Sequence, residues 1–104
     1  MSQAAVVTNP GPVSPAQSLS DDDRRKLQHM LGAIPGHYPR SKWGFRNHYA
    51  TNGGPALDAL RRMQALGLVS HGRTSGRMEF FHATELGCRA IGLDNKQIQR
   101  ALED

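Results

Sequence analysis

The sequence predicts one small domain that is mainly α-helical and carries a single β-hairpin. Three observations support this prediction. The 104 residues suffice for one ordinary domain, but they are too few for a barrel, a dinucleotide-binding fold or most complete enzymes. Apolar side chains recur at helical spacing in several separate segments. One pair of strand-like segments flanks a short polar loop bounded by glycines, which is the pattern of a hairpin.

A disordered N-terminal tail is expected over residues 1–19, followed by one domain over residues 20–104. Residues 1–18 hold three prolines, one glycine and no charged or aromatic side chain. Such a composition buries too little apolar surface to offset the entropy lost when the chain becomes ordered. Val6 and Val7 leave room for a short edge strand, which the nearby prolines limit to a few residues.

The first predicted helix runs from about Asp21 to Leu31. Ser20 is a suitable N-cap, and the acidic residues of the first turn complement the positive end of the helix dipole. Two glycines and two prolines between residues 32 and 40 then predict a loop.

The segment 41–51 is predicted to form a short second helix that begins at Ser41. Gly44 weakens a helix, so an irregular segment is the alternative. The aromatic side chains of this segment are interleaved with basic residues and could stack on single-stranded bases. Because the chain has only six aromatic side chains and needs most of them in its core, structural packing is the preferred interpretation for Trp43, Phe45 and Tyr49.

A third helix is predicted to start at Pro55, directly after the turn at residues 52–54. Proline is favoured in the first turn of a helix, and Gly67 is suited to the position just after the last turn. Periodicity gives the helix one apolar side and one mainly basic side. The apolar side holds Ala56, Leu57, Ala59, Leu60, Met63 and Leu66, and the other side holds Asp58, Arg61, Arg62 and Ala65.

The C-terminal part is predicted to contain the hairpin and two further helices. Residues 68–71 and 77–82 are the expected strands, and residues 72–76 form a loop with an exposed basic tip. Thr84 and a capping box at residues 94–97 mark the starts of the two helices. The apolar positions are Leu86, Ala90 and Ile91 in the first helix, and Ile98, Ala101 and Leu102 in the second.

Residues 57–87 resemble the second half of a winged helix-turn-helix domain. Residues 60–69 are similar to the end of the recognition helix, which closes on a Leu-Gly-Leu-Val turn into the first wing strand. Residues 73–77 resemble the wing, and residues 80–87 resemble the strand and helix start of MarR-like regulators. The chain departs from the family at residues 45–50, where an Ala-x-x-Leu-Gly-type stretch is usual. It departs again in the wing, where Ser-Gly-Arg replaces Asp-x-Arg.

The resemblance implies a winged helix-turn-helix fold that binds double-stranded DNA. A weaker similarity links the chain to small bacterial and prophage proteins that share Arg-Asn-His-Tyr and Gly-Leu elements. The expected function is therefore DNA binding by a small transcriptional regulator or a phage-type accessory factor. The helix from Pro55 would then lie in the major groove.

Charge points to the same class of partner. Thirteen Lys and Arg against nine Asp and Glu give a formal net charge of +4. Residues 37–82 contain seven basic and two acidic side chains, a net charge of +5. The candidate contact residues are Asn52, Asp58, Arg61 and Arg62 on or before the helix, Arg73 and Arg77 on the wing, and Lys42 and Arg46 in the preceding segment. An inert, solvated helix face is the alternative for the adjacent arginines.

The second hypothesis is a winged-helix module that binds protein without binding DNA, through the segment 43–49 or the last helix. The two hypotheses differ in whether Arg61, Arg62, Arg73 and Arg77 form one continuous surface, since divergence would favour a protein partner. A weak homodimer through residues 94–104 is also expected, with Ile98 and Leu102 on the contact side.

Other functions lack support in the sequence. The single cysteine, Cys88, excludes an intrachain disulfide and a Cys-only zinc site, and it is expected to be a buried apolar residue. His71 and His82 could face each other across the hairpin, but no third ligand is evident, so we expect no metal or other cofactor. No catalytic motif is present, which argues against an enzyme. Without a membrane span or a secretory signal, a cytoplasmic protein is expected.

Overall fold

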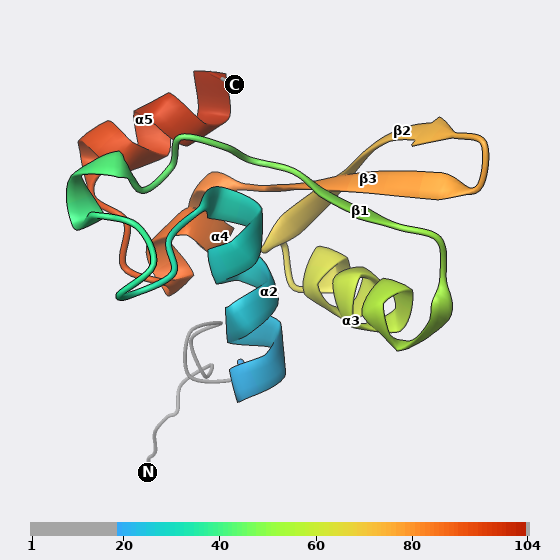
Figure 1. The fold of residues 1–104 in the computed structure, drawn as a ribbon. Helices are drawn as coiled ribbons and strands as arrows, with labels where there is room; N and C mark the ends of the chain where they lie inside the picture. Colours follow the sequence, from blue (N-terminus) through green and yellow to red (C-terminus); the bar gives the residue numbers. More distant parts are fainter. Residues whose placement is uncertain (1–18, 104) are drawn as a thin grey trace, which may run out of the picture.

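The structure, a computed structural model, describes residues 19–103 and combines helices with a three-stranded antiparallel sheet (Figure 1). The predicted disordered tail lies outside the described residues except for Leu19, which is partly buried against the core. In chain order the elements are α2 (Asp21–Leu31), the short 3-10 helix η1 (Arg40–Lys42), β1 (Tyr49–Thr51), α3 (Gly54–Ala65), β2 (Val69–Ser75), β3 (Met78–Ala83), α4 (Glu85–Ala90) and α5 (Asn95–Glu103).

Local capping signals define the helix starts, and here the predictions are confirmed. The Ser20 hydroxyl accepts a hydrogen bond from the Asp23 amide at 3.1 Å, and α2 ends at Gly32 with φ +66°. Thr84 caps α4 by accepting from the amide of the residue three positions on. The capping box of α5 is reciprocal, with both hydrogen bonds between residues 94 and 97 at 2.8 Å.

The predicted helix over residues 41–51 is wrong. Only Arg40–Lys42 form a 3-10 turn, and Tyr49–Thr51 form β1, which pairs with β3. Between these elements, backbone amides donate hydrogen bonds to carbonyls of distant residues and do not form the regular local hydrogen bonds of an α-helix. The Gly44 amide donates to the Leu31 carbonyl at 2.9 Å, for example, and Gly44 has φ +88°, which an α-helix does not allow. The domain is therefore mixed α/β, and β1 lies in the connection between α2 and α3.

The sheet has the order β1-β3-β2, with all pairs antiparallel. The hairpin is confirmed, but the predicted loop over residues 72–76 is too long. Strand β2 continues to Ser75, which pairs with Met78, so the turn is confined to residues 76–77. Between the pairs His71–Phe81 and Thr74–Glu79 the register shifts, so two residues of β2 oppose one of β3. This is a β-bulge at residues 72–73.

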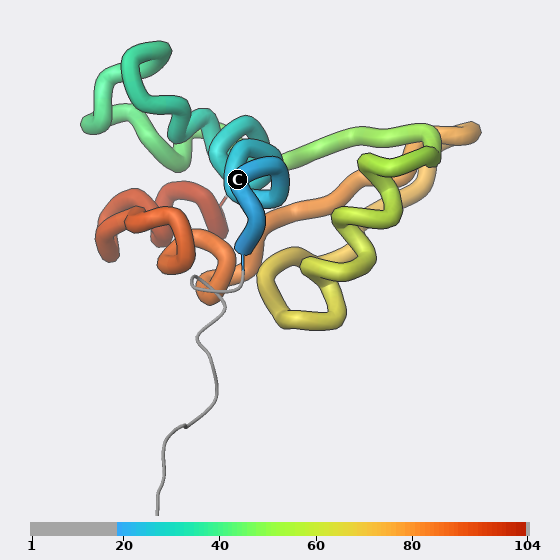
Figure 2. Tube along the Cα trace, turned by 90° about the horizontal axis from the view of Figure 1, so that it is seen from below, coloured from blue at the N-terminus to red at the C-terminus, as the bar shows by residue number. Residues whose placement is uncertain are grey.

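Helices cover one face of the sheet, which we call the inner face. Phe81 of β3 is fully buried there and belongs to one core cluster with side chains of α2 and α3. Figure 1 shows α2 and α3 below the strands, and Figure 2, seen from below, shows α3 beside the hairpin and α5 at the opposite end of the molecule. The core residues buried completely include Leu27, Met30, Leu31, Leu60, Met63, Leu68 and Cys88.

Three predicted apolar positions point outward instead. Leu66, Leu86 and Leu102 are 48%, 42% and 48% exposed. Leu66 lies at the C-cap of α3, where the chain turns away through Gly67 at φ +79°, so helical periodicity no longer places it on the core side. Ile98, assigned to the contact side of a dimer, is buried in the protein's own core, so only Leu102 of that pair is accessible.

A buried asparagine joins the segment before β1 to the C-terminal half of the chain. Asn47 is 4% exposed. Its Oδ1 accepts from the Ala83 amide at 2.7 Å, and its Nδ2 donates to the carbonyls of Ala83 at 3.1 Å and Ala101 at 3.3 Å. The side chain therefore satisfies buried backbone groups at the end of β3 and in α5.

The variant Asn47→Ala should lower the free energy of unfolding by about 2–4 kcal/mol, because it leaves buried amide and carbonyl groups without partners. Urea denaturation followed by circular dichroism measures this. The matched control is Asn95→Ala, at an exposed asparagine whose Oδ1 accepts from Arg89, and we expect a change within about 0.5 kcal/mol there. Equal stability of the two variants would contradict the role of Asn47.

Candidate nucleic-acid interface

Carboxylates engage the arginines of α3. Arg61 lies 3.3 Å from the carboxylate of Glu79 in β3, and Arg62 lies 3.2 Å from that of Asp23 in α2. The third predicted contact residue of the helix, Asp58, is itself acidic and exposed. The outer side of α3 therefore carries no marked excess of positive charge.

Arg73 lies on the other face of the sheet. Glu79 and Phe80 are neighbours in β3, and successive side chains of a strand point to opposite faces. Arg61 bonds to Glu79, whereas the Arg73 guanidinium lies 4.7 Å from the ring centroid of Phe80. Arg61 and Arg73 therefore diverge, so the arginines of α3 and the hairpin do not form the one continuous surface that distinguishes DNA binding from protein binding. This divergence favours a protein partner over DNA contact by α3 and the wing together.

The remaining predicted contact residues are dispersed around these two surfaces. Arg77 is exposed in the hairpin turn and Asn52 follows β1. Lys42 is exposed in η1, and Arg46 lies just before β1. Of the eight predicted residues, Arg73 lines a hollow on the sheet and Arg46 lines a neighbouring hollow that shares His48 with it, and the other six line neither.

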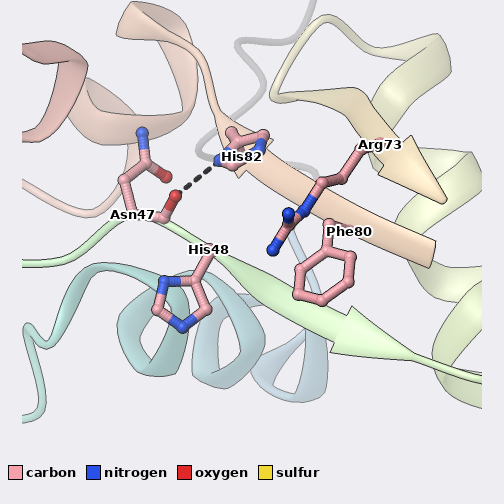
Figure 3. A pocket seen from close by; sticks show the side chains of 5 residues that line it. All are labelled: Asn47, His48, Arg73, Phe80 and His82. Carbon is pink, nitrogen blue, oxygen red and sulfur yellow. Dashed lines mark hydrogen bonds between the residues drawn. The ribbon is translucent and has the colours of Figure 1, made fainter. Parts of the chain in front are cut away.

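A hollow of about 440 Å³ lies on the outer face, the face opposite the buried Phe81 (Figure 3). The side chain of Arg73 reaches across from β2 beside the ring of Phe80, and His82 lies next to Phe80 along β3 (Figure 3). His82 Nδ1 donates to the backbone carbonyl of Asn47 at 2.6 Å, which fixes the orientation of the ring. The lining residues are Asn47, His48, Arg73, Phe80 and His82.

Two further hollows adjoin this one. A hollow of about 400 Å³ shares Asn47 and His82 with it and extends to Leu102 of α5. Another of about 290 Å³ shares His48 and extends to Arg46 and the edge of α2. We call the three together the sheet groove. In the part of the chain that the structure describes, no Asp or Glu lines it. The lining consists of His29, Arg46, Asn47, His48, Tyr49, Ala50, Ser70, Arg73, Phe80, His82, Ala83, Thr84, Ala101 and Leu102.

The environment at the α2 end of the groove is electropositive. Burial lowers the pKa of His29, and the charges of Arg46 and His48 lower it further. Arg46 Nη2 donates to the His48 carbonyl at 3.3 Å, and its buried Nε has no hydrogen-bond partner within the described residues. This end of the groove therefore disfavours additional positive charge and favours an anion.

Sequence reasoning missed four groove side chains, namely His29, His48, Phe80 and His82. The alternation of side chains along β3 places Phe80 and His82 on the face opposite Phe81. The groove on that face is nevertheless not predictable without β1, and the sequence predicts a helix where β1 lies. The preferred interpretation of the aromatic segment holds for Trp43, which is 7% exposed and donates its Nε1–H to the Tyr38 carbonyl. Tyr49 packs partly against the core, whereas Phe45 is 45% exposed.

His71 and His82 do not face each other across the hairpin. The register pairs His71 with Phe81 and His82 with Ser70, so the two imidazoles belong to opposite faces. His71 Nε2 lies 3.1 Å from Glu79 on the inner face. Among residues 19–103, no three His, Cys, Asp or Glu side chains gather in a way that could hold a metal ion.

Comparisons of the chain with protein-family models, curated proteins and solved structures find no match. The winged-helix resemblance therefore stays a prediction. No helix in the described part of the chain is long and apolar enough to cross a membrane.

Cys88 is buried, as predicted, and burial raises the pKa of its thiol to about 11. At pH 8 only about one thiol in a thousand is then ionised, so we expect Ellman's reagent to react very slowly with the folded protein and rapidly in urea. Because the folded pKa lies above the ordinary value of 9.0, the stabilisation from the neutral thiol is complete below pH 9.0 and is lost as the pH rises toward 11. Rapid labelling of the folded protein at pH 8 would contradict this assignment.

Proposed function

We propose that the protein binds nucleic acid through the sheet groove and the adjoining hairpin. The observation that carries the proposal is that, within residues 19–103, no carboxylate lines the groove, whereas Arg46 and Arg73 do. The backbone of a nucleic acid carries regularly spaced phosphates, so one strand could place an anion at each of several cations along the groove. The exposed Arg77 in the hairpin turn is a further cation on the same hairpin.

The ion pairs decide between the groove and α3. Binding phosphate with Arg61 or Arg62 would require competition with Glu79 or Asp23. Arg73 makes no ion pair within the described residues, and its guanidinium lies over the uncharged ring of Phe80. A phosphate or base can approach this guanidinium without displacing an acidic side chain.

Part of the arrangement of helices and strands resembles that of a winged-helix DNA-binding protein. Helix α3 leads directly into the hairpin, and β1 joins the hairpin at the β3 edge. In place of a second helix before α3, however, the chain forms β1. We therefore assign the contact to the hairpin and the sheet and not to a recognition helix.

A salt titration tests the proposal. We expect a labelled mixed-sequence DNA to bind at 50 mM salt, with a slope of log affinity on log salt of about −2 to −3 if Arg46, Arg73 and Arg77 each contact one phosphate. Arg73→Gln should reduce the magnitude of this slope by about one unit. Arg61→Gln is the matched control on the inner face and should leave the slope unchanged.

The outcomes separate the alternatives. An effect of Arg61→Gln without an effect of Arg73→Gln would assign the contact to α3. If single-stranded DNA, duplex DNA and an RNA strand all fail to bind at low salt while the protein stays folded, nucleic-acid binding is wrong. The protein-binding module then becomes the better hypothesis. The divergence of Arg61 from Arg73 already favours that module over DNA binding through one continuous surface of α3 and the wing.

A further inference from the structure

We infer that the nucleic acid is single-stranded and that one unpaired base enters the hollow formed by His48, Arg73, Phe80 and His82. This inference rests on the proposed function and names the form of the nucleic acid. Single strands are held by positively charged grooves that carry flat side chains for base stacking, and the sheet groove combines both features.

The β-bulge creates the stacking platform. Gly72 and Arg73 together oppose Phe80, and this extra residue in β2 brings the Arg73 side chain over the ring of Phe80. A side chain at Gly72 would collide with the imidazole of His82, so glycine leaves the space that the ring occupies. Guanidinium planes and aromatic rings are both surfaces on which unstacked bases lie in complexes with single strands.

The shape of the site favours a single-stranded nucleic acid over a duplex. Proteins that read duplex DNA directly insert a protruding helix or ribbon into a groove, and the part of the β2–β3 hairpin that could do so is its turn at residues 76–77. Arg73, Phe80 and His82 lie away from that turn. The flat groups here lie within a hollow, so a duplex would have to expose a base by breaking a pair and its stacking before that base could enter. A single strand avoids that cost because its bases are already free.

Fixed polar groups surround the base position. The hydrogen bond from His82 Nδ1 to the Asn47 carbonyl assigns a proton to Nδ1, since a carbonyl oxygen only accepts. The neutral ring therefore presents Nε2 as an acceptor, and the described residues provide no partner for it. A base amino group could donate to this atom.

The neighbouring hollows would hold the rest of the strand. The hollow toward α5 is lined by Ser70 and Thr84 as well as Leu102, and the hollow toward α2 brings in Arg46. A nucleic-acid strand that crosses the outer face and passes over the β1 edge toward α2 would thus meet a hydroxyl-bearing site, the stacking platform and a cation in succession. This arrangement suits a site of a few nucleotides.

Fluorescence anisotropy with a labelled 12-nucleotide DNA of mixed sequence, alone and as its blunt duplex, tests the inference. At 50 mM salt we expect the single strand to bind at least tenfold more tightly than the duplex. Phe80→Leu should weaken single-strand binding by about tenfold, because it removes a stacking surface and keeps apolar volume. Phe45→Leu is the matched control at a half-exposed phenylalanine outside the groove lining, and it should change affinity less than twofold.

An RNA strand of the same sequence is titrated in parallel. Whichever of the two single strands, DNA or RNA, binds with the higher affinity identifies the preferred sugar. Thermal unfolding of both variants confirms that they are folded. Duplex binding as tight as single-strand binding would overturn the inference and leave the proposed function intact. Equal affinities of Phe80→Leu and Phe45→Leu would also overturn it, whereas binding of none of the three, single-stranded DNA, duplex DNA and RNA, would reject the proposed function itself.

Discussion

The hydrogen bonds of the Asn47 side chain hold the domain together at the point where its two halves meet. A single amide satisfies the amide and carbonyl of Ala83 and the carbonyl of Ala101, which lie 36 and 54 residues further along the chain. Because the side chain is buried, water cannot replace these bonds without opening the core. The end of β3, the segment before β1 and α5 are consequently fixed against one another.

The groove depends on this constraint. Arg46 and His48 flank Asn47, so the bonds that fix Asn47 also place their side chains beside the outer face of the sheet. The Asn47 carbonyl in turn orients His82. From the other side, Arg100 of α5 donates to the carbonyls of Ser41 at 2.9 Å and Trp43 at 3.1 Å. Helix α5 therefore supports the segment that carries the groove, and a weak dimer through α5 could use little beyond Leu102.

How much could be predicted from the sequence depends on the range of the interactions involved. The helix starts at Ser20, Thr84 and Asp94 depend on hydrogen bonds between residues three apart, so their capping signals predict them well. Strand β1 has only three residues and exists because it pairs with β3, about thirty residues away, so its local pattern resembles a helix. The groove also depends on long-range pairing, since it combines residues from β1, β2 and β3, and local sequence patterns therefore do not predict it.

The two faces of the sheet use their arginines differently. On the inner face, Glu79 is shared by Arg61 and His71, and Asp23 is bonded by Arg62, so these charges are paired within the protein. On the outer face, Arg73 contacts an aromatic ring, and toward the β1 edge Arg46 contacts His48. No acidic residue among residues 19–103 lines the groove. Exposed ion pairs contribute little stability, but each one lowers the local potential that a phosphate would experience. The net positive charge of the central segment is therefore most available where the hairpin and β1 meet, and not along α3.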